Sequence, residues 1–254
     1  VLLAMASILL GATLGFAVYN IAFIVKATDS DFWQYTIVGG KNAEHDLQGL
    51  AKVTVYGPPS EADIDLQVSI LENVVNTKPD AIVISSTSSE APSLILDAAY
   101  KQGIKIVLID NFVYDTGYNS FLATNNAVGG AHAADKLVEA LKANGTALKG
   151  KVGLISAMAG VQVLTDRDAG FTNRLKEIAP DLQFLPTIYT NNDISRSANA
   201  AEDLLIAHSD LVGCFADNNH AGIGVARVIE QRGLENKIMA VAYDSDPLEI
   251  EALD

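Results

Sequence analysis

The sequence is poor in the residues that disulfides and metal sites require. Its single cysteine, Cys214, lies in the apolar run LVGCFA, which excludes an internal disulfide and favours a buried, inert thiol. The four histidines are scattered along the chain, and no Cys/His cluster has the spacing of a metal site. No metal is therefore expected.

Basic residues are also scarce. The 17 Lys and Arg residues stand against 31 Asp and Glu, so the formal net charge is −14. Binding to nucleic-acid phosphates needs clustered Lys and Arg, and we expect no nucleic-acid partner. A hydrophobic content of 49% and a charged content of 19% indicate a folded globular protein. The 254 residues suffice for two lobes or one large α/β domain.

The motifs of several enzyme classes are missing or stand in the wrong context. No GxGxxG follows the first predicted strand, and no GxSxG nucleophile elbow occurs. Gly145–Lys151 has the spacing of a phosphate-binding loop, but Val152 replaces the Ser or Thr and a strand follows. Asp166 and Asp168 remain as an acid–base pair, although nothing in the sequence supplies a raised pKa. We expect neither an enzyme nor a cofactor.

Residues 1–19, VLLAMASILLGATLGFAVY, carry no charge and allow two interpretations. They fit the apolar region of a signal peptide, with small residues at Gly15 and Ala17 for cleavage. They also fit a retained membrane anchor, because about twenty apolar residues span a bilayer. Both interpretations imply that the rest of the chain is exported.

The remaining chain alternates short apolar runs with helical patterns. Strands are predicted at 21–25, 51–56, 80–85, 104–109, 120–123, 151–156, 183–189, 211–216 and 238–243. Helices are predicted at 34–49, 64–75, 92–102, 127–144, 165–179, 195–207 and 221–232. This alternation indicates parallel, doubly wound sheets. Because the pattern restarts after residue 123, we expect an N-terminal α/β lobe at 20–123, a C-terminal lobe at 124–254 and a ligand cleft between them.

Polar side chains follow most of the predicted strands, where open α/β sheets bind ligands. Carboxylate and amide groups can each bond two hydroxyls, and aromatic rings cover the apolar C–H faces of a sugar. The planar fork of Arg167 suits a ring oxygen together with a neighbouring hydroxyl. The strand ends supply Lys26, Ser85–Ser89, Asp110–Asn111, Asp217–Asn219 and Asp244, and the aromatic pair Phe32–Trp33 follows the first strand. This lining predicts a sugar site.

Six segments carry a resemblance to a known family. They are IAFIVKATDSDFW, VLIDNF, LATNNAVGG, DRDAGF, FADNNHAGIG and AVAYDSDP. Their order and approximate spacing resemble periplasmic sugar-binding proteins of the ribose-binding type, the type I substrate-binding components of ABC transporters. The resemblance covers Asn20 to Asp254. Because the family continues beyond the position of Asp244 and returns to the first lobe, the C-terminal part is expected to be truncated.

The resemblance implies a fold, a location, partners and site residues. It implies two Rossmann-like lobes with parallel sheets, in a monomer in the periplasm or at the outer face of the bacterial cell membrane. It also implies a monosaccharide ligand and an ABC permease as partner. Phe32 and Trp33 would stack on the sugar, while Asp110, Arg167, Asn218 and Asp244 would bond its hydroxyls. Five other ligand-facing positions carry residue types that differ from those of the ribose binder: Lys26, Ser30, Ser85, Asn111 and Asn192. These differences argue against ribose itself as the ligand.

Two other functions share this fold. A membrane-tethered ectodomain would sense a sugar, or the furanosyl signal autoinducer-2, and feed a signalling partner. Lys26, Asp110 and Asp166 resemble the autoinducer-2 binder, but Asp217–Ala221 lacks the proline expected there. A LacI-type regulator would carry a basic helix-turn-helix at its N-terminus, which the uncharged segment 1–19 excludes for this chain.

Overall fold

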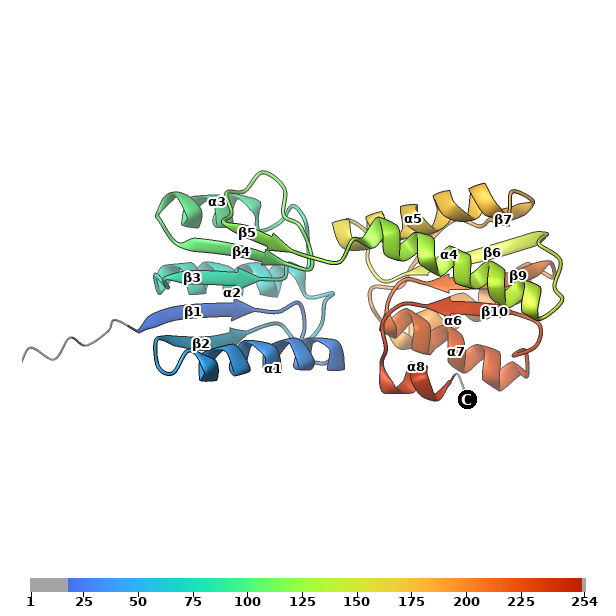
Figure 1. Ribbon diagram of the computed structural model, residues 1–254, viewed down its shortest axis with the longest axis horizontal. Coiled ribbons are helices and arrows are strands. Elements are labelled where there is room, and N and C mark those ends of the chain that lie inside the picture. Colours follow the sequence, from blue (N-terminus) through green and yellow to red (C-terminus); the bar gives the residue numbers. More distant parts are fainter. Residues whose placement is uncertain (1–17, 253–254) are drawn as a thin grey trace, which may run out of the picture.

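The computed structural model describes residues 18–252, which form two lobes that lie side by side along the long axis of the molecule (Figure 1). Most of the predicted signal or anchor segment lies outside these residues. Among the described helices, none combines the length and apolar character needed to cross a bilayer.

The first lobe contains one sheet with the strand order β2-β1-β3-β4-β5, and all its strand pairs are parallel. Each of the first three strands is followed by a helix, as a parallel sheet requires. Its elements are β1 (Tyr19–Ile24), α1 (Asp31–Asp46), β2 (Ala51–Tyr56), α2 (Ile64–Asn76), β3 (Ala81–Ile84), α3 (Ser93–Lys101), β4 (Lys105–Ile109) and β5 (Ser120–Leu122).

The second lobe contains a parallel sheet with the order β10-β9-β6-β7, and β8 also pairs with β6. The chain enters it through the short segment between β5 and α4 (Figure 1). Its elements are α4 (Asn126–Ala143), β6 (Gly150–Ser156), α5 (Gln162–Ile178), β7 (Leu182–Phe184), β8 (Ile188–Tyr189), α6 (Ile194–Ala207), β9 (Leu211–Ala216), α7 (Asn219–Arg232), β10 (Met239–Ala242) and α8 (Pro247–Glu251). The expected α/β fold of two lobes with parallel sheets is confirmed.

Each sheet is buried by apolar clusters. In the first lobe, Ile24, Ile84 and Leu108 of the sheet pack with Leu71 of α2 and Leu96 of α3. The other face of β1 packs against α1, where Phe23 and Val25 meet Trp33. The β-branched and aliphatic runs that predicted the strands are therefore the residues that fill the core.

Close packing of α4 on α5 depends on two glycines. A Cβ on Gly130 of α4 would lie 1.9 Å from the carbonyl oxygen of Arg167, and one on Gly170 of α5 would lie 2.0 Å from that of Ala127. Real side chains do not fit at these distances, so only glycine allows the two helix backbones to touch. This crossing fixes the part of α5 that carries Arg167.

Several boundaries differ from prediction for local reasons. Helix α1 begins at Asp31 with Ser30 as its N-cap, so the aromatic pair lies in its first turn. The strand predicted at 183–189 is split into β7 and β8, because Pro186 between them has no N–H to donate. Helix α8 was not predicted, although Asp246 and Glu249 form a capping box with a proline in the first turn.

Candidate functional site: a cavity between the lobes

A cavity with an empty volume of about 390 Å³ lies between the lobes, at the carboxyl ends of their strands. Both lobes contribute to its walls, as expected for a ligand site in an α/β protein. Its lining is Lys26, Ser30, Phe32, Trp33, Glu61 and Asp110 from the first lobe, and Val163, Leu164, Arg167, Asn218, Asn219 and Asp244 from the second.

Most of the predicted site residues meet in this cavity. Lys26, Phe32, Trp33, Asp110, Arg167, Asn218 and Asp244 all line it, as does Ser30. Ser85, Asn111 and Asn192 are buried next to the cavity but do not line it. Their polar groups bond to protein partners instead.

The aromatic pair forms one wall. Trp33 is 2% exposed and packs into the first lobe, whereas Phe32 is 43% exposed. Their ring centroids lie 4.9 Å apart with planes at 85°, an edge-to-face arrangement. The indole N–H of Trp33 donates to Oε1 of Glu61 at 2.7 Å. The Trp33 ring is thus held in place by contacts within the protein.

A buried ion pair lies beside this wall. Lys26 Nζ is 2.6 Å from Asp110 Oδ2, and Lys26 is only 3% exposed. The hydroxyl of Ser85 donates to the same Asp110 oxygen at 3.1 Å, and Lys26 Nζ lies 5.7 Å from the centre of the Trp33 ring. Asp110 adopts a left-handed backbone with φ of 60°, a conformation that Asp tolerates better than most residues. Ser85 therefore acts on the site through Asp110.

Arg167 projects from α5 into the opposite side of the cavity. Its Nε and Nη2 donate to Asn126 Oδ1 at 3.1 and 2.8 Å, and its Nη1 donates to the carbonyl of Asp217. The guanidinium also stacks on the Tyr243 ring at 3.6 Å. These contacts use part of the donor fork and fix its plane, and they leave one N–H on each of Nη1 and Nη2 able to donate to another acceptor.

The second lobe adds an amide and a carboxylate at the ends of β9 and β10. Asn218 caps α7 through Ala221 N at 3.0 Å, and its Nδ2 donates to Asn192 Oδ1 at 2.6 Å. Asp244 Oδ2 accepts the Asn219 N–H at 3.1 Å. Burial raises the pKa of Asp244, while the nearby charge of Arg167 opposes this shift. Asn192 thus positions Asn218 from behind.

Asn111 belongs to a contact between the lobes. Its Oδ1 accepts from Val163 N at 3.2 Å and from Ser89 Oγ at 3.3 Å, and its Nδ2 donates to Ser86 O at 3.0 Å. Ser89 Oγ in turn accepts from Gln162 N at 3.0 Å. The first N–H groups of a helix have no partners within the helix. Here, side chains of the first lobe cap α5 of the second.

Glu61 is a lining residue that the sequence did not reveal. It lies in the polar segment GPPSEAD between β2 and α2, which reads as a surface loop. Burial raises the pKa of its carboxyl, while Lys26 and the Trp33 hydrogen bond oppose the shift. Applying the strand-end rule to β2 was the one signal that could have found it.

A second acidic group lies below the cavity in the second lobe. Asp217 is fully buried and accepts from Ser156 Oγ and from Ala157 N at 2.9 Å, and burial raises its pKa to about 6. Burial and the Asp217 charge raise the pKa of Asp168 to about 8. A raised pKa is therefore present, contrary to expectation, but the partner of Asp168 is Asp217 and not Asp166. Asp166 instead accepts a hydrogen bond from Gln162.

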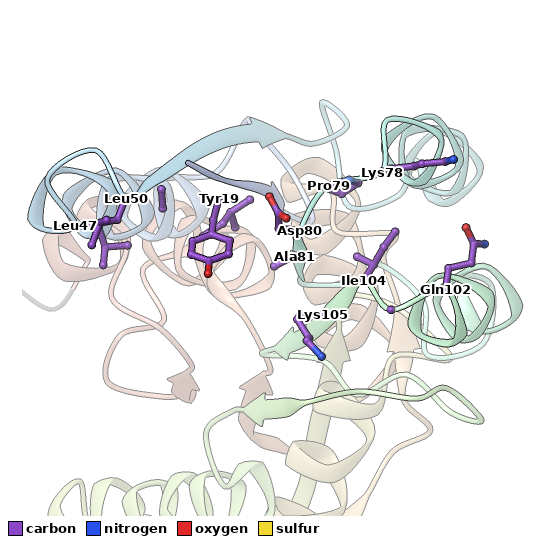
Figure 2. A pocket seen from close by; sticks show the side chains of 13 residues that line it. Tyr19, Leu47, Leu50, Lys78, Pro79, Asp80, Ala81, Gln102, Ile104 and Lys105 are labelled. Atoms are coloured by element: carbon purple, nitrogen blue, oxygen red, sulfur yellow. The ribbon is translucent and has the colours of Figure 1, made fainter. Parts of the chain in front are cut away.

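A larger open hollow lies at the other end of the first lobe. It has an empty volume of about 1500 Å³ and is lined at the amino ends of β1, β3 and β4. Figure 2 shows Tyr19, Leu47 and Leu50 on one side of it and Lys78, Ile104 and Gln102 on the other. None of the predicted site residues lines it. The smaller cavity is therefore the candidate site, because the convergent polar and aromatic groups are there.

Comparison with known proteins agrees with this geometry. A carbohydrate-transporter solute-binding protein from Agrobacterium radiobacter, crystallised with D-arabinose, is 36% identical, with a TM-score of 0.89 over 93% of this chain and 79% of that one. A solute-binding protein from Agrobacterium vitis with bound D-fucose is 33% identical, with a TM-score of 0.83 over 91% and 79% of the two chains. The D-allose-binding periplasmic protein of Escherichia coli is 25% identical over 93% of this chain and 76% of its own length.

The match to the family itself covers nearly the whole described chain. The family profile described as periplasmic binding protein domain matches residues 21–254. Its relatives by sequence are named as sugar-binding and sugar-import binding proteins, and the similar structures are described as solute-binding proteins of carbohydrate or ABC transporters. The resemblance seen in the sequence is thus confirmed, and the chain belongs to the periplasmic binding protein domain family.

Proposed function

We propose that this chain is an exported receptor that captures a monosaccharide in the cavity between its lobes and delivers it to an ABC permease. The observation that carries the proposal is the lining of that cavity. An aromatic wall and the Lys26–Asp110 pair face Arg167, Asn218 and Asp244 across the gap between two lobes. Carboxylates and amides bond sugar hydroxyls, and aromatic rings cover C–H faces. The D-arabinose and D-fucose complexes of the similar structures support the same ligand class.

The contacts between the lobes support capture by closure. Asn111 and Ser89 of the first lobe cap α5, and Asn219 Nδ2 of the second lobe lies 3.4 Å from Ser30 Oγ of the first. These bonds exist only while the lobes are together. A ligand that touches both lobes shifts the open–closed equilibrium toward this form, and the permease recognises it.

The test is a thermal-shift screen of residues 18–254 against pentoses, hexoses, polyols and autoinducer-2. A ligand at a hundred times its dissociation constant adds about 2.7 kcal/mol of stability, which raises the melting temperature visibly. We expect a single strong hit among the monosaccharides and a smaller radius of gyration with it in X-ray scattering. A panel without sugar hits would contradict the proposal, and a hit on autoinducer-2 alone would favour the sensory ectodomain.

A further inference from the structure

Glu61 is held in a defined position by the loop that carries it. The loop between β2 and α2 is fastened to the loop after β1, since Thr28 N donates to Pro58 O at 3.0 Å. Within the loop, Ser60 N donates to Asp63 Oδ2 at 3.2 Å. Glu61 is partly buried and contributes to the cavity wall. Its placement is therefore part of the built site and not a chance contact of a mobile side chain.

The two carboxylate oxygens of Glu61 have different partners. Oε1 accepts the indole N–H of Trp33 at 2.7 Å. No group in residues 18–252 donates to Oε2, and this oxygen is not among the atoms sealed inside the protein. A carboxylate accepts several hydrogen bonds, so Oε2 keeps its capacity for a donor that enters the cavity.

Charged groups converge on Glu61 from both lobes. Burial raises the pKa of Glu61 most, and Asp110 at the end of β4 adds to this shift. Lys26 at the end of β1 and His220 of α7 oppose it. Lys26, Glu61 and Asp110 line the same cavity, and Lys26 forms its ion pair with Asp110 at 2.6 Å. A hydrogen bond from a neutral hydroxyl to an ionised carboxylate is stronger than one between neutral groups. Such a bond would compensate Glu61 without adding charge to the site.

We propose that Glu61 is a specificity-determining residue of the sugar site. It fixes the Trp33 ring as a stacking surface through Oε1, and its Oε2 accepts a hydrogen bond from a ligand hydroxyl next to Lys26. This inference rests on the proposed function and adds a residue that binds the sugar directly from the loop after β2.

The experiment compares E61Q and E61A with wild type by calorimetric titration of the full chain with D-arabinose and D-fucose. In E61Q the amide oxygen still accepts the indole N–H, but the charge and the second acceptor are lost. We expect affinity for the bound sugar to fall about tenfold or more in E61Q. The matched control is E90Q, because Glu90 is exposed in the loop after β3 and does not line the cavity.

Tryptophan fluorescence and the pH dependence of affinity distinguish the two roles of Glu61, which are to bind the sugar and to position Trp33. Trp33 is the only tryptophan, so its emission reports on this contact alone. We expect the emission of ligand-free E61Q to match wild type and that of E61A to shift. The affinity gap between wild type and E61Q should narrow as the pH falls, because Glu61 takes up a proton in wild type only.

Three outcomes would overturn the inference. If wild type binds a sugar and E61Q binds it equally well at every pH, Glu61 does not contact the ligand. If E61A leaves the Trp33 emission unchanged, Glu61 does not fix the ring. If wild type binds neither these sugars nor any other monosaccharide, the proposed function fails and this inference fails with it.

Discussion

The two lobes use the same frame and place different chemistry on it. The strand order β2-β1-β3-β4 of the first lobe matches β7-β6-β9-β10 of the second. In both, an aspartate lies two residues past the last register pair of the final strand in this series: Asp110 after Leu108 and Asp244 after Ala242. Both aspartates adopt a left-handed backbone conformation, with φ of 60° for Asp110 and 83° for Asp244. The frame therefore brings one carboxylate from each lobe to the same cavity.

The helix N-termini show the same correspondence with a different outcome. Ser30 and Val161 are the N-caps of α1 and α5, and the second and third residues after each cap line the cavity. These pairs are Phe32–Trp33 in the first lobe and Val163–Leu164 in the second. One wall is aromatic and the other aliphatic. Topology thus decides where the site lies, and the residues at equivalent positions decide what each lobe can bind.

Removing the larger wall should have the largest effect. Trp33→Ala deletes a ring that is both buried and part of the cavity, so we expect sugar binding to be lost and stability to fall by about 3–5 kcal/mol. Leu164→Ala removes the equivalent aliphatic residue and should weaken binding much less. Calorimetric titration and urea unfolding measure both quantities. Trp33→Phe is the control that keeps a ring in place. Equal losses of sugar binding in Trp33→Ala and Leu164→Ala would show that aromatic stacking does not distinguish the first lobe from the second.

The two aspartates at equivalent positions, Asp110 and Asp244, should differ in how much they contribute to the free energy of unfolding. Asp110→Asn leaves the buried Lys26 ammonium without its partner, which costs roughly 3–5 kcal/mol. Asp244 accepts a backbone N–H and has a raised pKa, so Asp244→Asn should cost well under half as much in unfolding free energy. Urea unfolding of both variants at pH 7 gives the comparison.

A double variant separates stability from recognition in the first lobe. Replacing both partners, Lys26→Met with Asp110→Leu, removes the buried charges together and should restore most of the stability. Sugar binding should stay lost, because the hydroxyl partners are gone. If the two single aspartate variants lose equal stability, the ion pair is not a distinguishing feature of the first lobe.

The sequence predicts the frame because burial leaves a periodic record. Apolar runs such as Ile21–Val25 mark strands whose both faces are covered, and the alternation with helices marks parallel sheets. The polar residues directly after those strands, Lys26 and Asp110 among them, then fall at one edge by topology alone. That part of the site needs no knowledge of tertiary contacts.

The rest depends on contacts that no local pattern encodes. Glu61 lies in a polar loop, and only the fold brings it to Trp33. Asn111 directly follows Asp110, whose backbone is left-handed. The Asn111 side chain bonds to α5 and does not line the cavity. Asp168 acquires its raised pKa from burial beside Asp217, which is distant in sequence.

The hydrogen bond from Val163 N of α5 to Asn111 joins the two lobes, and its loss should have a smaller effect than the substitutions above. Asn111→Ala leaves the Val163 N–H without its acceptor, which destabilises the closed form by about 1–3 kcal/mol. X-ray scattering should then show a larger radius of gyration without ligand and a weaker sugar affinity. Ser30→Ala is the matched variant on the other contact, where the bond is longer at 3.4 Å, and should change the radius less. An unchanged radius in Asn111→Ala would mean that this cap does not hold the lobes together.

The last expected effect is a pH dependence of stability that arises mainly in the second lobe. The pKa values of Asp217 and Asp168 are raised to about 6 and about 8, from about 3.9 for an unfolded Asp. The folded lobe therefore holds more protons than the unfolded chain, and unfolding free energy falls as pH rises. The stability from these groups is complete below about pH 4 and is lost as pH passes 6 and then 8. Glu249, with its pKa raised to about 8, acts in the same direction.

Hydrogen exchange measured between pH 5 and 9 locates this loss within the molecule. Amides of α5 and β9 should lose more protection as pH rises than those of β3 and β4 in the first lobe, where burial raises the pKa of Glu61. Asp168→Asn should flatten the dependence in the second lobe, because its amide keeps the shape of the side chain and cannot ionise. The exposed Asp46→Asn should leave it unchanged. A slope in Asp168→Asn equal to wild type would remove Asp168 as the origin and leave Asp217, Asp244 and Glu249 as the titrating groups with raised pKa values in this lobe.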